Sequence, residues 1–161
     1  MFTKNGKALT ARGVKPICPF QQIFQSTYLF GAFSPINGAS FLLELPFCNT
    51  DSFQLFLNEF SSQNPNELKV VVLDNGAFHK SKRLEIPTNI ILIFLPPFSP
   101  ELNPAEKMWA KFKRAFTNKL YKTLNQVSAF ISEQVQYLKK ADTKSICAFD
   151  YIFLNRFWTK N

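Results

Sequence analysis

The stretch Val70-Val71-Val72-Leu73-Asp74-Asn75-Gly76 decides how the rest of this sequence is interpreted. A second apolar run, Ile90-Ile91-Leu92-Ile93-Phe94-Leu95, follows after a short connection. Neither run alternates apolar with polar side chains, which is typical of strands that are buried on both faces of a parallel sheet. We therefore predict two buried parallel strands joined by a crossover, with a short helix within residues 80–85.

Upstream of these runs, the sequence predicts a β-hairpin followed by a helix. Two short apolar segments, residues 28–33 and 40–45, flank the pair Asn37-Gly38, which suits the positive φ of a hairpin turn. Beyond a cap at residue 49 or 50, apolar side chains recur at i, i+3, i+4 and i+7 over residues 53–60. We expect this helix to end near residue 62.

Downstream, prolines end the second strand and Pro104 opens a helix over about residues 105–116. A further helix is predicted over residues 123–138, with Thr123 and Gln126 spaced as a capping box. Taken in order, a hairpin, a helix, two buried strands and C-terminal helices predict an α/β fold.

The charge of the chain favours a polyanionic partner. Its 161 residues carry 19 Lys and Arg against 11 Asp and Glu, a formal net charge of +8 and a pI of about 9.5. Residues 1–43 contain no acid, and bases again exceed acids over residues 101–161. A basic surface of this kind attracts phosphates. Ordinary solvation by lysine explains the same charge equally well.

Length and composition exclude several classes of protein. A mass of 18.5 kDa with 46% hydrophobic residues fits one packed domain, or a domain with a short appendage. No apolar run reaches the ~18–20 residues of a membrane span. Three widely spaced cysteines fit neither a disulfide framework nor a zinc site, so we expect a cytoplasmic setting and no membrane partner.

Asp74 is the first candidate for chemistry. It closes the run of residues 70–73 and therefore stands at the carboxyl end of a predicted strand, the edge at which open α/β sheets bind ligands. The alternative is that Asp74-Asn75-Gly76 only forms a turn after the strand. His79, the only histidine, lies five residues further on, where it would touch the same site or cap the short helix that follows. Asn75 and His79 are the candidates for residues adjacent to the site.

Glu106 is the second candidate, in the first turn of the predicted helix 105–116. A helical wheel groups Met108, Trp109, Phe112 and Phe116 as a buried stripe and places Glu106 at the border between this stripe and solvent. That location suits a metal-binding carboxylate, and it equally suits a glutamate that only stabilises the helix dipole. Carboxylate ligands indicate Mg²⁺ or Mn²⁺ rather than zinc.

Lys107, Lys111 and Arg114 lie on the opposite side of this wheel. They would meet phosphates if DNA is the partner, or form a solvated helix face if it is not. Arg12 and Lys15, in the basic N-terminal part, are the remaining candidates for DNA binding.

Two blocks of this sequence resemble the signature blocks of mariner-type DDE transposases, particularly the bacterial insertion-sequence branch. Residues 71–81, Val-Val-Leu-Asp-Asn-Gly-Ala-Phe-His-Lys-Ser, are similar to the second block. Residues 95–109, Leu-Pro-Pro-Phe-Ser-Pro-Glu-Leu-Asn-Pro-Ala-Glu-Lys-Met-Trp, are similar to the third. Residues 11–16 resemble the segment that follows the opening strand in members of this family. The spacing between Asp74 and Glu106 is close to the spacing that the family shows.

The resemblance implies a ribonuclease H-like fold, a mixed sheet flanked by helices, over residues 1–140, with residues 141–161 as a tail. It implies DNA transposition by metal-dependent phosphodiester cleavage and strand transfer, with Asp74 and Glu106 as the second and third acids of the triad. Two Mg²⁺ or Mn²⁺ ions are expected in a complete site. Double-stranded DNA, both transposon ends and target, is the expected partner, and a homodimer is a further expectation. Glu101 matches a non-catalytic position.

The first acid of the triad has no counterpart in the expected place. Among the upstream acids, Glu44, Asp51 and Glu59 fall in the predicted hairpin and helix rather than on an opening strand. We expect the first acid, and the first central strand that would carry it, to precede Met1, and the chain to be inactive alone. The alternative function is a non-catalytic DNA-binding or multimerising remnant of a transposase.

Overall fold

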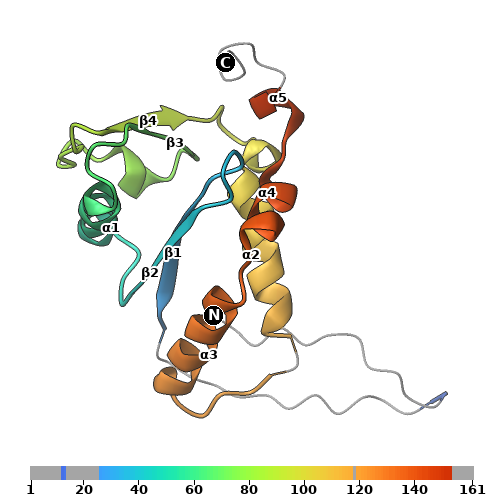
Figure 1. Ribbon diagram of the computed structural model, residues 1–161. Coiled ribbons are helices and arrows are strands. Elements are labelled where there is room, and N and C mark those ends of the chain that lie inside the picture. Colours follow the sequence, from blue (N-terminus) through green and yellow to red (C-terminus); the bar gives the residue numbers. More distant parts are fainter. Residues whose placement is uncertain (1–11, 14–25, 118, 154–161) are drawn as a thin grey trace.

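The computed structural model describes residues 12–13, 26–117 and 119–153 (Figure 1). The elements in this part of the chain are, in order, β1 (Tyr28–Phe33), β2 (Ser40–Leu45), α1 (Thr50–Ser62), β3 (Lys69–Leu73), the 3₁₀ turn η1 (Ala77–Lys80), β4 (Ile90–Phe94), the 3₁₀ turn η2 (Pro100–Leu102), α2 (Pro104–Ala115), α3 (Leu124–Gln136), α4 (Lys140–Cys147) and α5 (Asp150–Phe153). The predicted α/β class is confirmed.

The predicted hairpin is present, with Tyr28 opposite Leu45 and Phe33 opposite Ser40 in an antiparallel register. Its turn depends on Gly38, whose φ of +74° is a conformation that other residues rarely adopt. A Cβ at Gly38 would also lie only 2.3 Å from the carbonyl oxygen of Lys140, at the start of α4. Glycine is therefore required both by the turn and by the close approach of a distant helix.

Helix α1 begins and ends where the sequence predicts. The side chain of Asn49 caps it by accepting a hydrogen bond from the backbone N–H of Ser52 at 2.9 Å. Phe53, Phe56 and Leu57 are buried beneath it, and apolar side chains from all four strands complete this core.

The hairpin lies between α1 and α2 (Figure 1). It packs against both helices because alternate side chains of its strands face opposite sides. Phe30 and Ala32 pack toward α1, whereas Phe33 packs with Met108 and Phe112 of α2. At Gly31 the ring of Trp109 comes so close that an added Cβ would lie 2.8 Å from it. The buried stripe predicted for α2 is confirmed.

Strands β3 and β4 form the predicted parallel pair, in a register that runs from Lys69 opposite Ile90 to Leu73 opposite Phe94. The prediction that both faces are buried is wrong. One face packs on α1, but Ile91 and Ile93 on the other face are 47% and 42% exposed. Ile91 and Ile93 belong to none of the apolar clusters formed by the described residues.

The four strands make two separate two-stranded sheets, β1–β2 and β3–β4, rather than one mixed sheet. Within the described ranges, the two sheets are held together through the core under α1, to which both contribute side chains.

The expected short helix at residues 80–85 is wrong, and a single 3₁₀ turn lies at Ala77–Lys80 instead. Residues downstream of it are held by α1. Gln54 exchanges two hydrogen bonds of 2.8 Å with the backbone of Glu85, and Ser61 donates to Asn89 at 2.6 Å. Side chains of α1 thus replace helical hydrogen bonds in fixing the crossover.

The C-terminal helices pack around α2. Thr123 caps α3 as predicted, by accepting from the N–H of Gln126, but the side chain of Gln126 accepts from Lys122 rather than from Thr123. In α4, Thr143 and Cys147 are fully buried. The helix that begins at Lys140 therefore completes the core of the structure. The part of the apolar tail beyond residue 153 lies outside the described residues. No helix in the described ranges is long and apolar enough to cross a membrane.

Candidate active site

Asp74 follows β3 directly, and its carboxylate is held by its own loop. The Oδ1 atom accepts one hydrogen bond from the backbone N–H of Gly76 at 3.1 Å and another from Nδ1 of His79 at 2.9 Å. The side chain is 57% exposed, and Oδ2 has no hydrogen-bond partner among the described residues. One oxygen is therefore held by two hydrogen bonds, in a side chain that is more than half exposed.

His79, which donates to Asp74, packs against two aromatic rings. Its ring centroid is 4.5 Å from that of Phe53 and 4.1 Å from that of Phe78, and only 14% of its side chain is exposed. This burial lowers the pKa of His79, and the nearby charge of Asp74 opposes the shift without reversing it. The imidazole is thus neutral at neutral pH, and its Nδ1–H donates to the carboxylate.

The loop that leaves β4 forms the other wall of the site. The side-chain amide of Asn75 donates to the carbonyl oxygen of Leu95, which joins the end of β3 to the start of this loop. Between them lies a pocket of about 260 Å³, lined by Asp74, Asn75, Gly76, Leu95, Pro96, Phe98, Ser99 and Pro100. The structure therefore brings Asn75 and His79 to Asp74, where the sequence placed them as site-adjacent residues.

Glu106 lies in the first turn of α2, which the loop of residues 95–103 connects to the pocket. Asn103 caps this helix by accepting from the N–H of Ala105 at 3.0 Å. Glu106 is exposed rather than at the border of the core, because packing of α2 against the hairpin begins only at Met108. The carboxyl ends of β3 and β4 point toward this end of α2 (Figure 1).

The acids upstream of Asp74 have other partners or lie elsewhere. Glu44 accepts from the hydroxyl of Ser128 in α3 at 2.6 Å, and Asp51 pairs with Arg83 at 3.5 Å. Glu59 lies on the exposed side of α1. No group of three His, Cys, Asp or Glu side chains within the described ranges is placed to hold a metal ion. In their donor type and exposure, Asp74 and Glu106 still fit a hard divalent cation.

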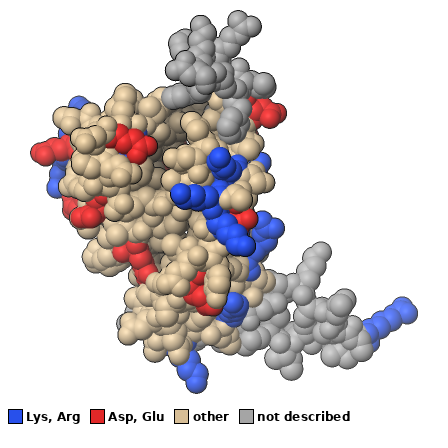
Figure 2. All heavy atoms as spheres, viewed as in Figure 1, with Lys and Arg blue, Asp and Glu red and all other residues tan. Residues whose placement is uncertain are grey.

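The basic residues predicted to bind DNA are only partly free. Lys111 forms an ion pair of 2.8 Å with Asp142 of α4, and this contact lowers the pKa of Asp142. The ammonium of Lys107 lies 4.2 Å from the ring centroid of Phe149. Arg114 hydrogen-bonds to a carbonyl of its own helix and has no acidic partner among the described residues, Arg12 is exposed, and Lys15 lies outside the described residues. Basic side chains gather over α2 and α4 (Figure 2).

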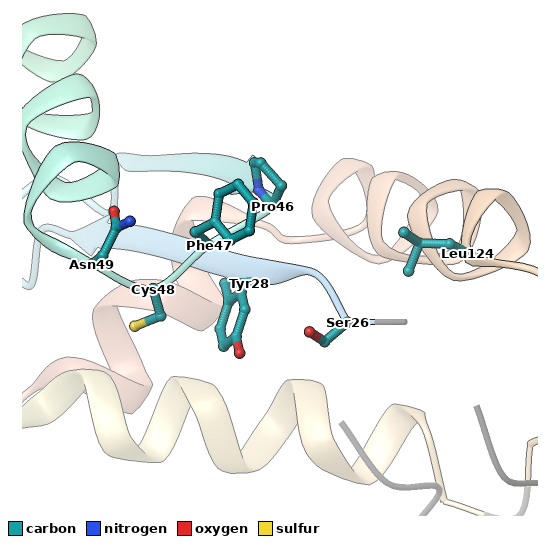
Figure 3. A pocket seen from close by; sticks show the side chains of 7 residues that line it. All are labelled: Ser26, Tyr28, Pro46, Phe47, Cys48, Asn49 and Leu124. Carbon is teal, nitrogen blue, oxygen red and sulfur yellow. The ribbon is translucent and has the colours of Figure 1, made fainter. Parts of the chain in front are cut away.

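A larger pocket, of about 560 Å³, lies at the N-terminal end of α1, between the start of β1 and the β2–α1 connection (Figure 3). Its lining residues are Ser26, Tyr28, Pro46, Phe47, Cys48, Asn49 and Leu124. None of them carries a carboxylate or a cation, and none lines the pocket at Asp74. Pocket volume therefore does not identify the candidate active site in this molecule.

Asp74 thus ends a parallel strand and Glu106 lies in the first turn of the next long helix, and no contact between the two side chains is found among the described residues. A family model described as DDE superfamily endonuclease matches residues 3–128, so the chain belongs to that family. Enzymes of this superfamily generally use divalent metal ions. A curated relative, the uncharacterized protein y4pE/y4sA of Sinorhizobium fredii, is 39% identical over 103 residues, which are 62% of this chain and 76% of that protein.

Two solved structures share the fold. The Mos1 strand transfer complex matches with a TM-score of 0.69 and 16% identity, over 91% of this chain and 48% of that chain. The paired-end complex of Mos1 transposase with the left transposon end matches with the same TM-score and coverage at 15% identity. The chain thus spans about half the length of these solved chains, and the predicted ribonuclease H-like fold is confirmed.

Sequence reasoning missed Phe98, which lines the pocket and is fully exposed. A signal was present, since an aromatic residue stands between Pro96-Pro97 and Pro100 in a segment that predicts no strand or helix.

Proposed function

We propose that this chain is the part of a transposase that cleaves DNA phosphodiester bonds and transfers the strand, with Asp74 and Glu106 as its metal ligands. The observation that carries the proposal is the state of Asp74, whose Oδ1 is held by Gly76 and His79 although more than half of the side chain is exposed. Membership of the DDE superfamily endonucleases and the shared fold with DNA-bound Mos1 complexes support it. The DNA is double-stranded and the setting cytoplasmic.

The chain's own residues prepare the site for such chemistry. His79 and Gly76 orient the carboxylate of Asp74, Asn75 ties the loop after β4 to the strand that carries it, and α2 presents Glu106 from its first turn. Mg²⁺ or Mn²⁺, two ions in a complete site, supplies activation of the attacking oxygen and stabilisation of the leaving oxygen. A third carboxylate is needed, on a strand that would lie between β1 and β3.

Metal-dependent nicking of supercoiled DNA tests the proposal. The chain alone is expected to show none, because it supplies two acids. When a strand that carries an aspartate is added upstream of Met1, nicking in Mg²⁺ or Mn²⁺ should appear. Asp74→Asn and Glu106→Gln should each abolish it, whereas Glu101→Gln, in the same loop region, should not. Activity that survives Glu106→Gln would remove that residue from the site.

A non-catalytic role is the second candidate, in which the chain binds DNA or assembles as a homodimer. The gathering of basic side chains over α2 and α4 favours it, together with the lack of a three-acid cluster among the described residues. DNA affinity that falls steeply with salt, without nicking even after the strand is added, would support this function over the first.

A further inference from the structure

Helix α4 is fixed in place along α2. Thr143 and Cys147, one turn apart on α4, are fully buried, and Cys147 packs with Met108 and Phe112 of α2. The thiol of Cys147 also donates to the carbonyl oxygen of Pro104, at the start of α2, over 4.0 Å. Side chains that flank these buried positions therefore meet the basic residues of α2 at defined points.

Asp142 is the first of these side chains, in the first turn of α4. Its Oδ2 lies 2.8 Å from Nζ of Lys111, and the two side chains are 42% and 40% exposed, so the ion pair lies at the surface of the molecule. A surface ion pair contributes little to stability. Its larger effect is on charge, because Lys111 already has an acidic partner within its own chain.

Phe149, just after α4, contacts α2 in a different way. Its backbone N–H donates to the carbonyl oxygen of Cys147 at 2.9 Å, and its ring centroid lies 4.2 Å from Nζ of Lys107. A ring face attracts an ammonium group but leaves it positively charged. Lys107 follows Glu106 directly in the sequence and forms no ion pair with an acid of the described residues.

We propose that residues 140–149 select which lysine of α2 contacts the DNA backbone: Asp142 withdraws Lys111, and Phe149 holds Lys107 ready for a phosphate next to Glu106. The inference rests on the proposed function and adds two residues that act through lysines. Asp142 prevents one phosphate from being neutralised, so it limits the affinity for DNA irrespective of sequence. Phe149 is a positioning residue, because a side chain that is ordered beforehand loses less entropy on binding.

Binding of a fluorescein-labelled duplex by the full chain, measured by anisotropy over a salt series, tests the role of Asp142. Asp142→Asn should raise the affinity about 5–10-fold at 0.1 M salt and steepen the slope of log K against log salt by about 1. Adding Lys111→Gln to this variant should remove the gain. Asp51→Asn takes the same charge from the ion pair with Arg83 and controls for net charge, with an expected gain below about 2-fold.

The same measurement tests Phe149. Phe149→Leu should weaken binding by about 2–10-fold, the cost of ordering one long side chain, and leave the salt slope unchanged because Lys107 keeps its charge. Phe149→Tyr, which keeps a ring, should bind as the wild type does. In a Lys107→Gln background, Phe149→Leu should have no further effect. A merely structural role would weaken binding equally in both backgrounds.

Docking of α4 is followed in each variant through Cys147, whose buried thiol should stay unmodified by iodoacetamide. Asp142→Ser provides the same comparison if Asp142→Asn exposes this thiol. Equal gains in Asp142→Asn and Asp51→Asn would overturn the role of Asp142, and equal weakening by Phe149→Leu with or without Lys107 would overturn that of Phe149. Both results leave the proposed function standing, whereas failure of the wild type to bind any DNA would refute it together with the inference.

Discussion

His79 governs the candidate site at the scale of single residues, although it carries none of the chemistry. It is packed against Phe53 and Phe78 and donates to Asp74, so the carboxylate is oriented by a residue that the core holds in place. Residues that orient a metal ligand in this way affect affinity nearly as strongly as the ligands do.

Replacing His79 should therefore weaken metal binding without removing a ligand. His79→Gln is expected to lower the affinity of the chain for Mn²⁺ by about 10–100-fold, measured by the electron paramagnetic resonance signal of the free ion. His79→Asn should recover most of it, because its amide nitrogen occupies the place of Nδ1. In the wild type, nitrogen NMR should show the proton on Nδ1, and Asp74→Ala should shift it to Nε2. Equal affinities of the Gln and Asn variants would contradict the role.

Cys147 offers a residue-scale test of burial. Its side chain is fully buried, and this raises the pKa of the thiol to about 11, whereas Cys48 is exposed. Because this pKa lies above that of the unfolded chain, about 8.5, the buried thiol contributes stability that is fully present below about pH 8.5. That contribution is lost as the pH rises toward 11. Iodoacetamide at pH 8, with peptide mapping, should modify Cys48 and spare Cys147. Modification of both at similar rates in the native state would show that α4 is not docked.

At the scale of elements, α1 is the helix on which both sheets depend. Leu57 is fully buried in its core, while Leu55 on the same helix is 45% exposed. Leu57→Ala should lower the free energy of unfolding by about 2–5 kcal/mol, since it leaves a cavity that the packed rings fill poorly. Leu55→Ala should change it by less than about 0.5 kcal/mol. Urea unfolding followed by circular dichroism compares the two.

How far the sequence predicts these elements depends on how local their causes are. The capped helix at Asn49, the turn at Gly38 and the start of α2 at Pro104 are set by residues within a few positions, and all three are found as predicted. The face of β4 that carries Ile91 and Ile93 depends on what covers it elsewhere in the chain. Periodicity carries no information about that partner, and the prediction of burial is wrong there.

The site was predictable to the same limited extent. Asp74, Asn75 and His79 are close in sequence, so their contact follows from a single turn after β3. The pairing of Lys111 with Asp142 joins α2 to α4, and the exposure of Phe98 follows from a φ that residue type disfavours. No local sequence pattern predicts the long-range ion pair or the unfavourable backbone angle.

At the scale of the whole molecule, the basic surface makes a prediction about DNA. The affinity of the chain for DNA should fall steeply with salt, because each neutralised phosphate releases counterions. Arg114→Gln and Lys107→Gln should each reduce the slope of log K against log salt by about 1. Lys111→Gln should reduce it less, because Asp142 already neutralises that charge. Fluorescence anisotropy over a salt series measures these slopes, with Lys82→Gln, on the crossover, as the control.

Equal slopes for the Lys107, Lys111 and Arg114 variants would show that the ion pair opens when DNA binds. If none of the three substitutions alters the slope, the DNA binds elsewhere on the molecule. Both outcomes are distinct from an affinity that does not respond to salt, which would exclude a phosphate-directed interaction altogether.

The division of the strands into two sheets has a consequence for thermodynamic linkage. Asp74 extends from β3, which α1 holds, whereas Glu106 extends from α2, which packs on the hairpin and α4. A cation that engages both acids would bind only when these two packing units are assembled, and would stabilise that assembly by mass action. At a hundredfold excess over its dissociation constant the gain is about 2.7 kcal/mol. The resistance of the fold to heat should therefore rise with the concentration of divalent ions, and cease to do so in Asp74→Asn.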